Sequence, residues 1–494
     1  MFFNSLLFMF IFLPAAFVLV SLTPTRFKTT TLLGLSIFFY AWSEGSFTGV
    51  LLLLTAANYL LGLALEGSPS PRRKRNLLAA GILMNIGMLA AFKYAGFLHE
   101  NVNAVLEWIH ARPLSPLSSR FQFHVGVSFV TFLLISYLVD VSRGAGAIHD
   151  PLRMASYTLF FPRLPAGPIV RYAQSLDQID PRAVHAQEMA EGIRRFTQGL
   201  AKKVLIADTL SLPCFYLFSI SADSLTPGLA WWGALCYFVQ IYFDFSGYTD
   251  MAIGLGCLFG FRLPENFNFP YASQSVMEFW RRWHISLTNW LREYLYFPIS
   301  LKLNRQFISG KQWGMMAADC LATMIVFSLC GLWHGASWNF LAWGAYHGIF
   351  LSFERMGLKK ILDSCGRIFR HAYLLLVIMA GWVLFRLNNI SRAIGWWKTM
   401  LFLKNGTGVD PYYWRCCVNA EALTAAGAGL FLAFPIFQSL RSFAQRSAAD
   451  RTNCAPSKQP WMIWGGNAAY VLLLGLSVTR IVGGNFHPFI YFKF

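Results

Sequence analysis

His334 lies in a motif whose residue types could support acid–base chemistry. The motif is Gly331-Leu332-Trp333-His334-Gly335-Ala336-Ser337-Trp338-Asn339. Small residues leave space beside the imidazole, and the tryptophans provide surfaces against which a substrate could pack. A neutral imidazole can accept the proton of a hydroxyl as that oxygen attacks a thioester carbonyl, which contributes about 10²- to 10⁴-fold in rate. A structural histidine that joins two helices by hydrogen bonds fits the same spacing, so both interpretations stay open.

A second histidine, His284, lies in a segment rich in tryptophan and arginine. On a continuous helix, one face would carry Trp280, Trp283, Leu287, Trp290 and Tyr294, and another would carry Arg281, Thr288 and Arg292. His284 falls between the two faces. The pattern predicts either an interfacial helix anchored by tryptophan and arginine, or a cytoplasmic vestibule in which Arg281 and Arg282 bind an anionic acyl carrier such as coenzyme A.

Two acidic residues, Asp244 and Asp250, belong to a polar motif inside an apolar region. Their spacing does not place both carboxylates on one helical face, so paired acid–base carboxylates or a metal site are disfavoured. We expect structural hydrogen bonds around a broken helix instead. The proline-rich segment 160–171 predicts a re-entrant or interfacial element that lines a cavity.

Other reactive residue types do not form recognisable sites. We expect structural roles for four further histidines, His124, His347, His371 and His487. The nine cysteines lack metal-like spacing, which favours small buried side chains over a metal site. The chain contains no nucleophile elbow, phosphate-binding loop or zinc signature. A histidine-centred reaction without a covalent enzyme intermediate is therefore the simplest catalytic option.

Membrane-spanning helices are expected to position these residues. The 494 residues are 56% hydrophobic and 13% charged, whereas soluble domains carry about 25% charged residues and a spanning helix needs about 20 mostly apolar ones. Apolar stretches recur at 6–22, 31–42, 50–65, 77–97, 125–141, 204–220, 230–245, 251–261, 317–333, 338–353, 373–385, 422–437 and 461–478. This pattern predicts an all-α polytopic protein with roughly eleven to thirteen transmembrane or re-entrant helices.

The basic residues predict how the chain is oriented. Arg26, Lys28 and the run 72–75 follow the first and third apolar stretches, so the positive-inside rule places both loops in the cytoplasm. The alternation then places His334 near the outer end of a hairpin, and the segments 281–311, 354–370 and 441–458 inside. Apolar and basic residues at helical spacing in 191–205 predict an interfacial amphipathic helix. Since the formal charge of +18 is distributed among such short clusters, nucleic-acid binding is not expected.

With these motifs the chain resembles the membrane-bound O-acyltransferase (MBOAT) family, especially its bacterial members that O-acetylate polysaccharides such as alginate. The resemblance runs nearly end to end and rests on residues 126–129, 161–171, 244–250, 266–271, 280–287, 331–338 and 488–494. It implies that His334 is the catalytic residue and His284 the second functional histidine. It also implies a helical bundle around a central tunnel, a thioester donor that enters from the cytoplasm, and a separate extracytoplasmic acetyltransferase as partner.

Together these inferences predict one integral-membrane domain over 1–494, with an MBOAT-like core at about 120–390, in a bacterial inner membrane among its lipids. The expected activity is transfer of an acetyl group from acetyl-CoA toward a hydroxyl of an extracytoplasmic polysaccharide, with no bound cofactor or metal. Besides the two histidines, substrate contacts are expected from Arg281, Arg282, Trp333, Trp338, Asn339 and Asp244. The alternative is a polysaccharide or acyl-group transporter, or an assembly scaffold, without catalysis of its own.

Overall fold

The computed structural model describes residues 1–116, 124–221, 223–307, 312–387, 389–436, 460–484 and 488–490. The segment 441–458, expected to be an inner loop, and His487 lie outside the described residues. Wherever the structure is described, the regular elements are helices, which confirms the predicted all-α class.

The helices differ widely in length, and short segments connect them. The first half contains α1 (Leu13–Leu22), α2 (Lys28–Glu44), α3 (Phe47–Glu66), α4 (Pro71–Leu89), α5 (Ala95–Trp108), α6 (Val127–Ser142), α7 (Pro151–Leu159), α8 (Tyr172–Ser175), α9 (Ala186–Ala201), α10 (Asp208–Ser219) and α11 (Pro227–Leu258). The second half contains α12 (Val276–Arg282), α13 (Ile285–Leu291), α14 (Phe297–Phe307), α15 (Gln312–His334), α16 (Trp338–Phe353), α17 (Lys359–Ser364), α18 (Arg367–Arg386), α19 (Ile390–Met400), α20 (Pro411–Cys417), α21 (Ala420–Leu432) and α23 (Pro460–Gly483).

Short π-helical and 3₁₀ segments connect several of these helices. The π-helical segments are η1 (Phe8–Phe12), η3 (Ala90–Tyr94), η5 (Lys202–Ala207), η7 (Arg292–Tyr296) and η8 (Glu354–Leu358), and the 3₁₀ segments are η2 (Thr25–Phe27), η4 (Leu176–Gln178) and η6 (Pro270–Ala272). A π-helical turn inserts an extra residue into a helix and redirects the side chains that follow it. Two of these segments, η3 and η7, adjoin the site described below.

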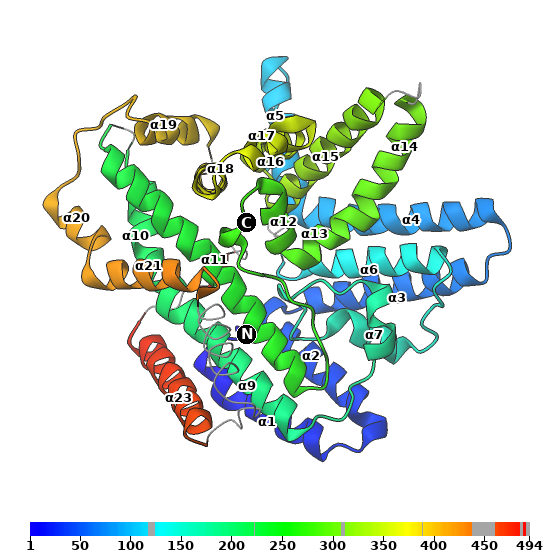
Figure 1. Ribbon diagram of the computed structural model, residues 1–494. Coiled ribbons are helices and arrows are strands. Elements are labelled where there is room, and N and C mark those ends of the chain that lie inside the picture. The colour runs from blue at the N-terminus through cyan, green and yellow to red at the C-terminus, as the bar shows by residue number, and fades with distance from the viewer. Residues whose placement is uncertain are drawn as a thin grey trace.

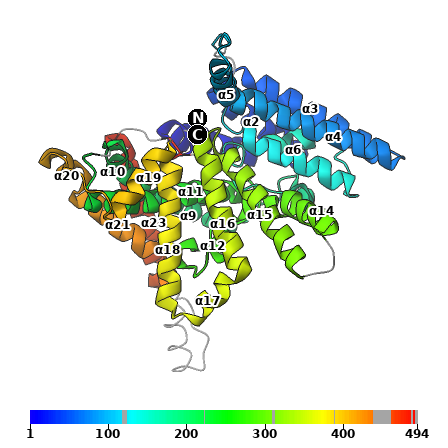
Figure 2. The ribbon, with the colours of Figure 1, turned by 90° about the horizontal axis from the view of Figure 1, so that it is seen from above.

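Helix α11 crosses the middle of the molecule, with α3, α4 and α6 on one side and α10, α20, α21 and α23 on the other (Figure 1, Figure 2). Its side chains are buried along most of its length. The Thr226 side chain accepts a hydrogen bond from the Leu229 N–H and Pro227 begins the helix, both of which favour a helix start here. The stretches 230–245 and 251–261, expected as separate segments around a broken helix, lie on one continuous helix as far as Leu258, so that prediction is wrong.

Glycines allow α9 and α11 to pack at very short range. A Cβ atom at Gly199 would lie 2.4 Å from the carbonyl oxygen of Gly247, and one at Gly192 would lie 2.8 Å from that of Gly254. The two glycines of each helix have the same spacing, so the backbones touch at two successive levels. Small residues that let backbones approach closely are typical of helix contacts in membranes. A larger side chain at any of the four positions would separate the helices.

This close approach brings cations of α9 and η5 onto the carboxylates of α11. The ion pairs are Lys203–Asp244 at 2.6 Å, Lys202–Asp250 at 2.6 Å and Arg195–Asp250 at 2.8 Å. Because side chains of a neighbouring helix neutralise the carboxylates, the α11 backbone need not unwind to satisfy them. The predicted helix over 191–205 is confirmed, but its assignment to an interfacial basic surface is wrong for Lys203, whose side chain is only 2% exposed.

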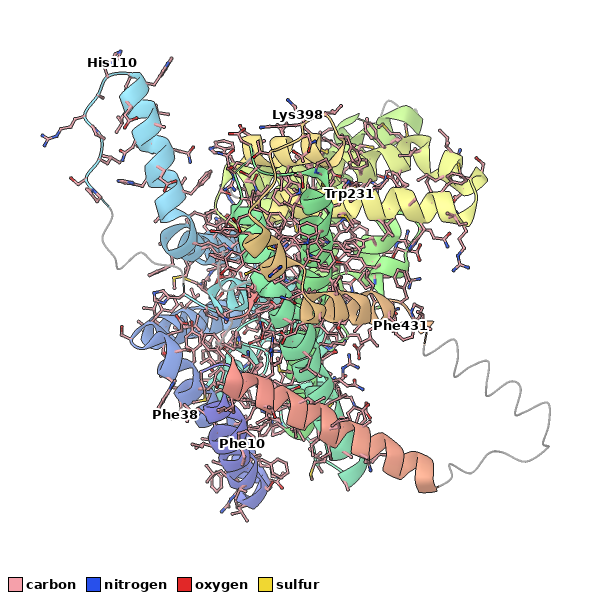
Figure 3. The ribbon with its side chains drawn as sticks, turned by 90° about the vertical axis from the view of Figure 1, so that its left-hand side faces the viewer. Phe10, Phe38, His110, Trp231, Lys398 and Phe431 are labelled. Carbon is pink, nitrogen blue, oxygen red and sulfur yellow. The ribbon has the colours of Figure 1, made fainter. Side chains whose placement is uncertain are left out.

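The protein is a multi-pass membrane protein, as predicted. In the described part of the chain, the helices Phe47–Glu66, Pro71–Trp108, Gly314–His334, Arg367–Arg386 and Gly466–Gly483 are long and apolar enough to cross a bilayer. Phe8–Leu22 and Val127–Ser142 are shorter apolar helices. Large aromatic side chains also lie on the outer surface, such as Phe10, 58% exposed, and Phe38, 51% exposed (Figure 3). Such exposure of apolar surface suits contact with lipid.

Candidate active site

His334 ends helix α15, and a short turn leads from it into α16. The two helices form a tight antiparallel hairpin because glycines lie where their backbones cross. A Cβ atom at Gly331 would lie 2.1 Å from the Phe340 carbonyl oxygen, and one at Gly344 would lie 2.1 Å from that of Phe327. Gly331 of the motif and Gly344 of α16 thus bring the two backbones together near the point where His334 ends its helix.

Aromatic rings surround the His334 side chain. His334 is 4% exposed, and its ring lies edge-to-face against Trp343 at 5.2 Å and Phe385 at 5.5 Å between centroids. The Trp333 ring lies 4.8 Å away. The rings come from α15, α16 and α18, so the packing of three helices fixes the position of the imidazole. Rigid aromatic walls of this kind also exclude water from a reacting group.

His284 lies between two helices, in a left-handed backbone conformation with φ +46°. The predicted continuous helix across Trp280–Tyr294 is therefore wrong: α12 ends at Arg282 and α13 begins at Ile285. The break arises because the Ile285 N–H donates to the Asn266 carbonyl oxygen at 2.9 Å instead of continuing the helix. A left-handed conformation costs a residue other than glycine about 1–3 kcal/mol, and such costs concentrate at functional sites.

Asn266 determines which nitrogen of His284 carries the proton. The Asn266 Oδ1 atom accepts hydrogen bonds from the Ser286 N–H at 3.1 Å and the Ser286 hydroxyl at 2.9 Å. Since a backbone N–H can only donate, the side-chain atom at this position must be the oxygen. His284 Nδ1, 3.2 Å from the same oxygen, must then be the protonated nitrogen. The lone pair of the buried imidazole therefore lies on Nε2, which is available to accept a hydrogen bond.

Trp333 connects the two histidine motifs. Its ring lies 4.8 Å from His334 and 6.3 Å from His284, and it stacks on Phe132 of α6 at 5.1 Å. Both histidines are buried, at 4% and 1% exposure respectively. The fold thus brings two histidines from distant motifs into one aromatic cluster.

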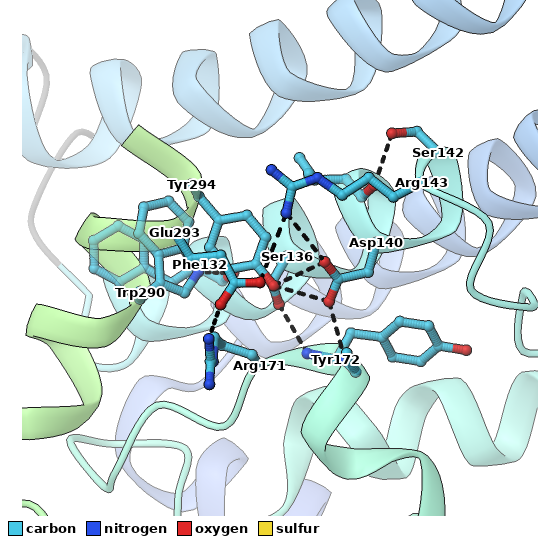
Figure 4. A network of polar contacts seen from close by, with 12 residues as sticks. Phe132, Ser136, Asp140, Ser142, Arg143, Arg171, Tyr172, Trp290, Glu293 and Tyr294 are labelled. Atoms are coloured by element: carbon cyan, nitrogen blue, oxygen red, sulfur yellow. Dashed lines mark hydrogen bonds and ion pairs between the residues drawn. The ribbon is translucent and has the colours of Figure 1, made fainter. Parts of the chain in front are cut away.

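A network of polar contacts holds the segment that follows His284 (Figure 4). The Tyr294 hydroxyl donates to the Asp140 carboxylate of α6 at 2.8 Å, and the Ala173 N–H donates to the same carboxylate at 3.0 Å. Arg171 forms an ion pair with Glu293. Because three separate chain segments meet here, the network anchors α13 and η7 and thereby the start of α13 at His284.

The proline-rich segment 160–171 is an irregular buried element between α7 and α8, and its re-entrant or interfacial position stays a prediction. Its Ile169 N–H donates to the Ser286 hydroxyl at 3.0 Å, so it contacts the His284 motif directly. A Cβ atom at Gly126 would lie 2.8 Å from the Leu164 carbonyl oxygen, and Gly126 has φ +86°. Glycine is required there on both counts. The cavity that the segment lines is small, about 20 Å³.

The other predicted contact residues are more dispersed. Trp338 is 60% exposed and donates to Asn101 Oδ1 at 2.9 Å, while the Asn339 amide donates to carbonyl oxygens at the end of α18. Arg281 is exposed at the end of α12, and Arg282 pairs with Glu278 at 2.7 Å. Trp333 is the predicted contact residue that lies between the histidines. The assignment of Trp338, Asn339, Arg281 and Arg282 to substrate stays a prediction.

A cavity of about 630 Å³ adjoins the turn after His334. Gly335, Ala336 and Ser337 form part of its wall, together with Lys203, Asp208, Asp244, Gln240 and Arg386. The Arg386 guanidinium lies over the rings of Phe218 at 5.6 Å and Tyr237 at 5.9 Å, which holds it by cation–π contact. The cavity therefore combines fixed charges with direct access to the backbone that carries His334.

Comparison with known proteins agrees with this arrangement. The model of the MBOAT, membrane-bound O-acyltransferase, family matches residues 76–390. The chain belongs to the membrane-bound O-acyltransferase family. It is 36% identical to the probable alginate O-acetylase AlgI of Azotobacter vinelandii and 35% identical to that of Pseudomonas aeruginosa, in each case over 100% of both chains. It is 30% identical to the peptidoglycan O-acetyltransferase of Helicobacter pylori, over 100% of this chain and 97% of the relative. The protein is thus an O-acyltransferase, as expected.

Three further residues of this O-acyltransferase, Asn266, His347 and Lys93, lie at the site although they were not predicted to contact substrate. Asn266 orients His284, and His347 packs against Trp280 at 5.0 Å and Trp343 at 5.0 Å in the same cluster as His334. The expectation of a structural role for His347 stays a prediction. Lys93 contacts the end of α15. A signal for Lys93 was present, since it is the only charged residue of the apolar stretch 77–97.

Replacing Asn266 by leucine is expected to lower acyl transfer about tenfold or more, because His284 and Ser286 would lose their shared acceptor and His284 would reorient. The rate per folded protein in purified membranes measures this effect. Asn304→Leu removes a side-chain hydrogen bond to Ser300 on α14 and is the matched control. Equal rates for Asn266→Leu and the parent protein would show that the tautomer and orientation of His284 do not matter.

Proposed function

We propose that this O-acyltransferase passes an acetyl group from a cytoplasmic thioester, acetyl-CoA, toward a hydroxyl of an extracytoplasmic polysaccharide, with His334 as general base. The observation that carries the proposal is the meeting of His334 and His284 in one buried aromatic cluster beside a cavity. The names of the relatives support an acetyl group and a polysaccharide such as alginate or peptidoglycan.

The proposed reaction needs only a base at His334. The neutral imidazole accepts the proton of the acceptor hydroxyl as its oxygen attacks the thioester carbonyl. The tetrahedral intermediate then expels the coenzyme A thiolate, and the imidazolium returns the proton to sulfur. The products are an acetyl ester and free thiol, and His334 is neutral again. The aromatic rings around His334 exclude water, which limits hydrolysis of the thioester.

His284 is the second functional residue in this proposal. With Nδ1–H held by Asn266, its Nε2 atom can accept a hydrogen bond from a reacting group near Trp333. In this proposal the exposed Arg281, and Arg282 beside it, attract the phosphates of coenzyme A. The positive-inside distribution of charge supports a cytoplasmic position for these arginines.

The cavity beside residues 335–337 is the proposed entry for the acceptor from the other side of the membrane. The alternation of spans supports an outward-facing position for this turn. Its charged lining suits a hydroxyl-rich, hydrated ligand better than a lipid chain. A separate extracytoplasmic acetyltransferase is the proposed partner: it supplies the acceptor hydroxyl at this cavity and then passes the acetyl group to the polysaccharide. A bacterial inner membrane is the proposed location.

Purified protein in liposomes provides the test. With labelled acetyl-CoA on the side of Arg281 and a polysaccharide such as alginate on the other side, together with the partner transferase, we expect thiol release and acetyl ester formation. Acetyl-CoA added only to the opposite side should give neither. Appearance of intact acetyl-CoA or free acetate across the membrane without ester formation would favour the transporter instead.

The orientation can be measured separately. In a variant without reactive cysteines, a cysteine at Asn289 should react with an impermeant thiol reagent from the cytoplasmic side, and one at Ser337 should react from the outside. Reaction of both from the cytoplasm would contradict transfer across the membrane and leave the acyltransferase activity itself standing.

A further inference from the structure

Lys93 and Tyr94 lie on η3, the π-helical segment between α4 and α5. The combined helix Pro71–Trp108 is apolar enough to cross a membrane, and Lys93 is a cation within its apolar part. A charged side chain at such depth is costly unless it has a partner or a function. Both residues contact the C-terminal end of α15.

Each of the last four carbonyl groups of α15 accepts a hydrogen bond. A helix leaves its last four carbonyl groups without partners inside the helix. At α15 the Gly331 carbonyl accepts from the Gly335 N–H at 3.3 Å. The Tyr94 hydroxyl donates to the Leu332 carbonyl at 2.9 Å, and Lys93 Nζ donates to the carbonyls of Trp333 and, at 3.4 Å, His334.

Electrostatics favours the same arrangement. The C-terminal end of a helix carries a partial negative charge, and a cation placed there is stabilising. Lys93 Nζ also lies 5.5 Å from the centroid of the Trp333 ring, so one ammonium group contacts both the backbone and the side chain of the residue before His334.

The π-helical turn explains how two consecutive residues can both reach this end. In a regular α-helix, neighbouring side chains diverge around the axis. The extra residue of a π-helical turn changes that spacing, and such turns occur frequently at functional sites. Here Lys93 and Tyr94 reach the carbonyls of consecutive α15 residues.

We propose that Lys93 and Tyr94 are positioning residues for the acyl transfer. They clamp the last turn of α15 and thereby hold the imidazole of His334 at a fixed depth between Trp333, Trp343 and the cavity-lining turn. This inference rests on the proposed function, because it assigns the base to His334. Neither residue acts on the substrate, so the clamp contributes to the chemical step through the position of His334 and leaves donor binding unchanged.

The test uses two variants of the full-length protein in liposomes that also hold the polysaccharide and the partner transferase. Lys93→Met keeps side-chain length but removes the charge and all donors, and Tyr94→Phe removes one hydroxyl. We expect kcat for thiol release from acetyl-CoA to fall about 10- to 100-fold in Lys93→Met, since a displacement of about 1 Å can cost 100-fold. We expect a fall of about 3- to 10-fold in Tyr94→Phe, the loss of one hydrogen bond. KM for acetyl-CoA should stay within about twofold of the parent value, because donor binding is unaffected.

Two matched control variants distinguish loss of the clamp from the general effect of removing a hydroxyl or a lysine. Tyr59→Phe removes a hydroxyl that donates to the His149 carbonyl at 2.8 Å, and Lys404→Met removes a lysine that pairs with Asp223 at 3.1 Å. Both should match the parent. If Lys93→Met does not fold, the kcat of Tyr94→Phe alone tests the clamp. An unchanged kcat, or a change in KM alone, would overturn the clamp. A parent protein that does not turn over acetyl-CoA would overturn the proposed function instead.

Discussion

Replacing His334 by alanine is expected to lower acyl transfer by about 10²- to 10⁴-fold, the range that a general base contributes. The ring lies among Trp333, Trp343 and Phe385, and alanine cannot take up a proton there. The measurement is ester formation from labelled acetyl-CoA by purified protein, normalised to the amount of folded protein.

The control for this variant is His149→Ala. The His149 side chain is 74% exposed and pairs with Glu66 at 2.9 Å. Its removal should leave the rate unchanged. Parental activity in His334→Ala, at parental abundance in the membrane, would exclude His334 as the base. His334 would then be a structural histidine.

Replacing Lys203 by methionine is expected to destabilise the fold by about 3–5 kcal/mol, the cost of removing one partner of a buried ion pair. The Lys203 side chain is 2% exposed and lies between two carboxylates, Asp208 at 2.5 Å and Asp244 at 2.6 Å. Without the ammonium group, the buried Asp244 carboxylate of α11, 3% exposed, would lose its cation and be left near the Asp208 carboxylate at the start of α10, 15% exposed. Folded protein recovered from membranes and its unfolding midpoint measure the effect.

Lys404→Met is the matched control for stability. Lys404 pairs with Asp223, which is 91% exposed, and exposed ion pairs contribute only about 0–1 kcal/mol. A double variant, Lys203→Met with Asp244→Asn, should recover part of the lost stability because it removes one of the two anions. A normal unfolding midpoint in Lys203→Met would contradict a structural role for the ion pairs between η5 and α11.

The membrane class, the helical fold and the two histidine motifs could be predicted from the chain. Hydropathy is a local property, so apolar stretches such as 77–97 identify membrane helices without knowledge of their neighbours. Residue types are equally local, so His284 and His334 stood out among tryptophans and glycines. The family resemblance followed from such motifs.

The features of the fold and site that could not be predicted depend on contacts between segments distant in the chain. Helix α11 is continuous because Lys203 and its neighbours neutralise Asp244 and Asp250, which no local pattern shows. The helix around His284 breaks because Asn266 competes for the backbone. The Lys93 clamp joins segments far apart in the chain. Burial makes an unpaired polar group costly, so the partner of each such group is selected by packing, and packing exists only in the folded molecule.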